Sequence, residues 1–176
     1  MKKIALFLLN IFVFTALMLY LLPKENLYYL LEQNLEKESL VFNNEKFKDK
    51  GLQFEVRDSV LFYKGIESAE IGKTRFDFFL LYNAVVFKGV KVSNIAQNFM
   101  PPYVNRVDFR YTIFDPLRIR GKARGEFGEA DIFLHLLEKK IRVILLPSEI
   151  MLQKYKNSLK KFKKSEDGEY VYEQNI

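Results

Sequence analysis

The stretch VDFRYTIFDPLRIRGKARGEF, residues 107–127, decides the fold of this chain. From Val107 to Ile113 apolar and polar residues alternate one by one, Asp115-Pro116 supplies turn residues, and the alternation resumes as far as Phe127. A period of two places successive side chains on opposite faces of a β-strand, and Asp-Pro is typical of a tight turn. The stretch therefore predicts two antiparallel strands, each with one apolar and one polar face.

The second of these strands carries four cations on its polar face, about 6–7 Å apart at the usual rise per residue. These are Arg118, Arg120, Lys122 and Arg124. They could contact an anionic lipid headgroup, a phosphate or a carboxylate. The alternative is the solvated outer face of a half-exposed antiparallel sheet, which the strict alternation favours.

Alternating runs continue on both sides of this stretch, separated by turn residues. Strands are predicted for residues 52–57, 60–65, 75–82, 85–92, 130–136, 141–145 and 169–173. Asn83-Ala84 is expected to be a hairpin connection, and Pro101-Pro102 to divide the two β runs. The predicted fold class is mainly β, a curved antiparallel meander that follows an N-terminal transmembrane helix and has short flanking amphipathic helices.

The apolar positions of these strands predict one buried face. The side chains expected to face the interior are Phe54, Val56, Phe109, Tyr111, Ile132, Leu134, Val143 and Leu145.

A nearly unbroken apolar run occupies residues 4–22. As a helix it is about 28 Å long, close to the roughly 30 Å hydrocarbon core of a bilayer. Lys2 and Lys3 precede it, so the positive-inside tendency leaves residues 1–3 in the cytoplasm and exports the rest. The rival interpretation is a cleavable signal peptide. The run is long for one and ends in the bulky residues Tyr20 to Leu22, so an uncleaved anchor is expected.

Two amphipathic helices flank the predicted strands within the exported part. Residues 23–38 should form a juxtamembrane helix, and residues 148–164 a basic helix at the end of the β-rich domain, residues 39–176. The apolar stripe of the second helix is Leu152, Tyr155, Leu159 and Phe162. Its lysines include Lys156, Lys160, Lys161 and Lys163, further candidates for anionic headgroups. Such a helix either rests on a membrane surface or packs on the sheet.

Composition argues against catalysis. The chain has no cysteine, which excludes disulfides, thiol nucleophiles and cysteine-bound metals. His135 is the only histidine, whereas a metal site needs several ligands. The glycines at 121, 125 and 128 form no nucleotide-binding motif. We therefore expect no enzymatic activity, no cofactor and no metal site. The net charge of +6 is only mildly basic and gives weak support for nucleic-acid binding.

The anchor, the repeated meander and the glycine-punctuated stretch from Asp115 to Gly128 together resemble envelope proteins of the AsmA-like group. Protein N of type II secretion systems is similar in layout. The resemblance covers residues 40–146. It implies an inner-membrane protein whose periplasmic, curved sheet can shelter lipid acyl chains or assist a secretion or envelope assembly. This chain is much shorter than those proteins, which argues against a self-sufficient lipid conduit.

The expected function is that of a non-enzymatic domain, anchored in the bacterial inner membrane and exposed to the periplasm. It would bind a lipid or an envelope partner in envelope biogenesis or transport, and it would not bind nucleic acid. The alternative is a structural accessory subunit of a secretion apparatus that binds protein through the edge of its sheet.

Overall fold

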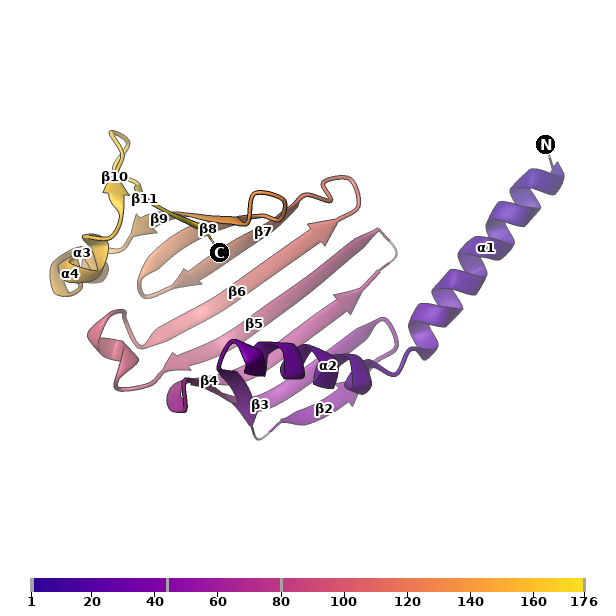
Figure 1. Ribbon diagram of the computed structural model, residues 1–176, viewed down its shortest axis with the longest axis horizontal. Coiled ribbons are helices and arrows are strands. Elements are labelled where there is room, and N and C mark those ends of the chain that lie inside the picture. Colours follow the sequence, from indigo (N-terminus) through magenta and orange to yellow (C-terminus); the bar gives the residue numbers. More distant parts are fainter. Residues whose placement is uncertain (1, 44, 80, 176) are drawn as a thin grey trace.

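The computed structural model describes residues 2–43, 45–79 and 81–175. It confirms a mainly β chain built on one antiparallel sheet that curves without closing (Figure 1). The strand order is β1-β3-β4-β5-β6-β7-β8-β9-β11-β10, and β2 also pairs with β3. Because β5 pairs directly with β6, the two predicted β runs form one continuous sheet across Pro101-Pro102.

The strands vary from two to thirteen residues. Their bounds are β1 Leu40–Asn43, β2 Lys46–Asp49, β3 Gln53–Tyr63, β4 Ile66–Phe78, β5 Tyr82–Val92, β6 Tyr103–Thr112, β7 Arg118–Gly125, β8 Gly128–His135, β9 Lys140–Pro147, β10 Lys163–Lys164 and β11 Tyr170–Asn175. The helices are α1 Lys2–Leu21, α2 Lys24–Lys37, the short 3₁₀ helix η1 Ala96–Asn98, α3 Glu149–Lys154 and α4 Lys156–Leu159.

Several strand predictions need correction. The two strands expected within residues 52–65 are the single strand β3, which continues through Asp58 in a left-handed conformation (φ 56°). The strand expected at 75–82 begins earlier, as β4. The hairpin connection predicted at Asn83-Ala84 is wrong, since both residues lie inside β5 and Phe79 to Leu81 join the strands. The final strand, β11, lies between β9 and the short edge strand β10 rather than at the edge itself.

The strand register sorts the side chains onto two unlike faces. One cross-strand row runs through Phe54, Phe76, Val85, Phe109 and Gly121 and continues to Ile132 and Val143. The neighbouring row, on the opposite face because the pleat alternates, starts at Glu55 and Arg75 and includes Asp108, Lys122 and Asp131. The sheet therefore has an apolar face and a charged face, as the alternation predicts.

Helix α2 covers the apolar face over the first strands (Figure 1). Tyr28 of α2 packs against Phe47, Phe54 and Phe76, with ring centroids 5.3, 6.2 and 6.0 Å away. Phe54 and Val56 are each only 1% exposed, in keeping with the prediction that they face the interior.

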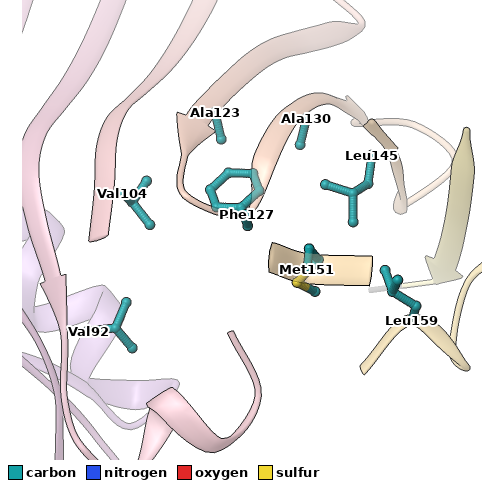
Figure 2. Packing of buried hydrophobic residues seen from close by; sticks show 8 residues of the cluster. All are labelled: Val92, Val104, Ala123, Phe127, Ala130, Leu145, Met151 and Leu159. Carbon is teal, nitrogen blue, oxygen red and sulfur yellow. The ribbon is translucent and has the colours of Figure 1, made fainter. Parts of the chain in front are cut away.

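A second apolar cluster lies where α3 and α4 pack on the far end of β6 to β9, and Figure 2 shows its buried side chains. They are Val92, Val104, Ala123, Phe127, Ala130, Leu145, Met151 and Leu159. Ser148 caps α3, since its Oγ accepts a hydrogen bond from the Met151 amide at 3.2 Å.

The prediction of one basic helix over residues 148–164 is wrong. The segment breaks at Tyr155 into α3 and α4 and ends at Leu159, and Lys163 lies in strand β10. The predicted apolar stripe is only partly right, because Leu152 is exposed and Met151 is buried instead. Leu159 and Met151 are part of the second core cluster, so the segment packs on the sheet.

Helix α1 projects away from the sheet, and none of its residues is buried (Figure 1). Among the described residues it is the one helix long and apolar enough to cross a membrane. Helix α2 follows after Pro23, where a juxtamembrane helix was predicted.

Candidate functional site

The candidate site is an apolar trough between α2 and the uncovered middle of the apolar face. Its volume is about 450 Å³. Helix α2 forms one wall with Tyr28, Leu31, Glu32 and Leu35. The rest is lined by β1, β4, β5, β6, β7 and β8, through Phe42, Thr74, Phe76, Val85, Phe87, Phe109, Ile119 and Leu134.

The trough exists because α2 covers only part of the face. Phe109, Ile132 and Leu134 are half-buried, although their strands place them on the same side as the fully buried Phe54. Tyr111 and Val143, also predicted to face the interior, are half-buried as well. The prediction chose the correct face, and two of its eight side chains, Phe109 and Leu134, line the trough, whereas Ile132 and Val143 pack against the second core cluster.

Gly121 leaves room for the ring of Phe109, which lines the trough. A Cβ atom at this position would lie 2.7 Å from Cε1 of Phe109 and 3.1 Å from Cβ of Ile132. Contacts below 3 Å are repulsive, so a larger residue would displace the Phe109 ring. Glycine in the middle of β7 therefore allows the aromatic ring of the neighbouring strand to lie flat along the sheet.

Two polar groups lie along the α2 wall. The Tyr28 hydroxyl donates a 2.7 Å hydrogen bond to Oε1 of Glu45, and burial together with that carboxylate raises the pKa of Tyr28 well above its usual range. Burial also raises the pKa of Glu32, and the nearby carboxylates of Glu45 and Glu36 raise it further. Both shifts disfavour the charged forms of these two side chains.

Among the described residues that line the trough there is no cysteine, histidine, lysine or arginine, and the hydroxyl groups are those of Thr74 and Tyr28. Across the described ranges 2–43, 45–79 and 81–175, no three His, Cys, Asp or Glu side chains are grouped so as to hold a metal ion. His135, the one histidine of the sequence, lies in β8 opposite Arg118 and Lys140.

The predicted cation row lies on the other face of the sheet, and its members are paired with acids. Arg118 and Arg120 both bind Asp115, with distances of 3.1 and 2.9 Å. Lys122 pairs with Asp131 at 3.4 Å, and Arg124 pairs with Glu129 at 3.3 Å. Hydrogen bonds from Arg120 and Arg118 lower the pKa of Asp115. Three acids thus pair with the four cations on a solvated face of the sheet, and the structure does not bring the row to the trough.

The predicted lysines of the C-terminal segment do not meet the cation row either. Lys156 is in α4, Lys160 and Lys161 follow it, and Lys163 is in β10, all exposed. The apolar residues beside them are used in the second core cluster. The two sets of predicted headgroup contacts therefore form no common site.

Sequence reasoning missed the contribution of α2 to the trough. Residues 23–38 were predicted as an amphipathic helix, and an apolar stripe on a helix is a signal that it covers something apolar. The sequence holds no signal for where on the sheet the helix rests.

The chain matches no protein-family model, and neither the curated proteins nor the solved structures compared with it give a match.

Proposed function

We propose that this chain is a non-enzymatic envelope protein, anchored by α1 in the bacterial inner membrane, whose periplasmic domain holds a lipid acyl chain in the trough. One observation supports the proposal most directly. Aliphatic and aromatic side chains line almost the whole trough, and α2 does not cover it. A groove lined in this way excludes polar ligands, because their hydrogen-bonding groups would be left without partners.

The size of the trough supports the same ligand class. About 450 Å³ lies within the roughly 300–1,000 Å³ typical of small-molecule sites. A flexible hydrocarbon chain gains free energy from every buried methylene and needs no polar partner. The proposal extends the resemblance to AsmA-like proteins, whose sheets are associated with lipid.

The anchor supports the location. Helix α1 is twenty residues long, none of them is buried, and Lys2 precedes its apolar part. The charge bias orients the N-terminal end toward the cytoplasm and the β domain toward the periplasm.

The alternative function, a secretion subunit that adds a partner strand to its sheet edge, has less support. The described edges end in short strands, the four-residue β1 and the two-lysine β10. Short strands and lysines at an edge discourage the addition of another strand.

Native mass spectrometry of the full-length chain, extracted with a mild detergent, tests the proposed function. Leu134→Trp should fill the trough, whereas Phe133→Trp puts the same side chain on the charged face of the same strand. We expect phospholipid adducts on the wild-type chain and on Phe133→Trp, and a several-fold loss of adducts on Leu134→Trp. Equal adducts on all three would show that the trough is not the lipid site.

A further inference from the structure

Four connections between strands meet at one end of the sheet. The register pairs Phe78 with Asn83, Tyr82 with Thr112, and His135 with both Arg118 and Lys140. The β4–β5, β6–β7 and β8–β9 connections therefore lie side by side. The β2–β3 connection joins them, because Gln53 pairs with Asp77 at the same end.

Large apolar side chains are exposed on three of these connections. Phe114 is 80% and Leu137 77% exposed, which leaves nearly the whole of each side chain in contact with solvent. Connections between strands usually carry polar turn residues, so this composition is unusual. The exposed side chains, called the rim from here on, are Phe79, Leu81, Ile113, Phe114, Leu136 and Leu137.

Helix α1 leaves the domain at the same end. Gly51, in the β2–β3 connection, packs so closely on the Tyr20 ring that any side chain there would overlap it. The ammonium group of Lys24 bonds the carbonyl oxygens of Tyr20 and Leu22 and the carboxylate of Asp49 at the end of β2. Figure 1 shows α1 leaving from the end where β6 stops and β7 starts.

Cations beside the rim are held in ion pairs. Arg118 and Arg120 share the carboxylate of Asp115, and Lys140 pairs with Glu173 at 2.8 Å. The feature that this end offers to a partner is therefore apolar surface. Neighbouring large apolar side chains that are exposed in this way mark an interaction site.

We propose that the rim lies in the interfacial layer of the same bilayer that α1 crosses, so that the sheet contacts the membrane with its end. This rests on the membrane anchoring in the proposed function and does not depend on lipid in the trough. The bilayer is the occupant because α1 brings its surface to this end of the sheet, and because aromatic and aliphatic side chains are stable at that depth. Since the nearby cations are paired, contact should depend little on anionic lipid.

Site-specific fluorescence tests the rim in the full-length chain. The sequence has no cysteine, so a single cysteine can be labelled with the environment-sensitive dye NBD at any position. The rim sites are Phe114→Cys and Leu137→Cys. Phe99→Cys is the matched control, an aromatic residue 66% exposed in the β5–β6 connection at the other end of the sheet. Phe12→Cys, within α1, reports whether the anchor is in the bilayer.

The labelled proteins are reconstituted in phosphatidylcholine liposomes with and without nitroxide-labelled lipid, and circular dichroism checks that each is folded. We expect several-fold stronger quenching by the lipid nitroxide at 114 and 137 than at 99, and unchanged quenching when anionic lipid is added. Quenching at position 12 but not at 114 or 137 would show that α1 is in the bilayer and the rim is not, which would overturn the proposal for the rim. A blue-shifted dye at 114 without lipid quenching would assign the rim to contact between two copies and would equally overturn the proposal. No quenching at 12 would contradict the anchor, and with it both proposals.

Discussion

Lys24 places its ammonium nitrogen 3.1 Å from Oδ2 of Asp49 while its own side chain is fully shielded from solvent. The same nitrogen bonds the carbonyl oxygens of Tyr20 and Leu22, two of the last carbonyl groups at the end of α1. A helix end leaves such carbonyl groups without partners inside the helix. One lysine thus ends α1, begins α2 and ties both to the sheet.

Replacing Lys24 by methionine should loosen this junction. The change keeps the apolar stem but leaves the carbonyls and Asp49 without their donor, at a cost of about 1–3 kcal/mol in the free energy of unfolding. Chemical denaturation in detergent measures it. Lys46→Met is the matched control. The side chains of Lys46 and its partner Asp58 are both exposed, so losing this pair should change stability by less than about 1 kcal/mol. Equal effects of the two variants would show that the buried position of Lys24 has no special role.

Gly121→Ala should disturb the trough through Phe109. The new Cβ overlaps the ring in its present position, so the variant should lose about 1–3 kcal/mol of stability and bind less lipid. Gly72→Ala serves as the control, since a Cβ there makes only ordinary contacts at 3.5 Å. Thermal unfolding and lipid retention of the two variants give the comparison. Wild-type behaviour of Gly121→Ala would mean that Phe109 has room to move.

Glu55 gives the stability of the domain a defined pH dependence. Its buried carboxylate accepts hydrogen bonds from Lys50, Lys73 and Arg57, which lower its pKa from 4.5 to about 2. Because the folded state holds the proton less tightly than the unfolded state, this contribution is complete above pH 4.5 and is lost as the pH falls toward 2.

The free energy of unfolding, measured from pH 6 to 2, should therefore differ between Glu55→Gln and the wild type. The variant should be less stable near pH 6, by about 1–3 kcal/mol, and should approach the wild type near pH 2. Glu70→Gln is the control, because the pair of Glu70 with Lys91 is long and exposed. A constant difference between Glu55→Gln and the wild type from pH 6 to 2 would rule out this linkage.

The C-terminal segment should act through packing. Leu159 is 5% exposed within the second core cluster, so Leu159→Ala should cost about 2–5 kcal/mol. Changing Lys156, Lys160, Lys161 and Lys163 to Gln should leave both stability and liposome binding of the full-length chain close to the wild type. Weaker liposome binding of the lysine variant than of the wild type at low salt, with the difference lost at high salt, would restore a membrane-surface role for this segment.

The sequence predicted the individual helices and strands better than the way they pack against one another. The apolar run and the strict alternation around Phe109 and Ile119 are local patterns, and each predicted its helix or strand. The first half of β4 was missed because Ser68, Ala69 and Gly72 give little contrast between faces. The β4–β5 connection was misplaced because it has no turn residues.

The trough depends on contacts that no local pattern contains. Phe109 and Leu134 were assigned to the correct face, yet their access to an open trough depends on where α2 stops covering the sheet. Likewise, the pairing of each cation in β7 with an acid depends on register and on the turn that carries Asp115. Both features depend on tertiary packing, whereas the periodicity of the sequence specifies only which face of the sheet a side chain lies on.

The most direct measurement for the central claim, an acyl chain in the trough, is photo-crosslinking in a bilayer. The full-length chain is reconstituted with a phospholipid that carries a diazirine near the middle of one acyl chain, irradiated, digested and analysed by mass spectrometry. We predict crosslinks to Leu35, Ile119 and Leu134 in addition to those on α1, with the crosslink at Ile119 lost in Leu134→Trp. Crosslinks confined to α1 and the rim, with none on the strands that line the trough, would contradict the account.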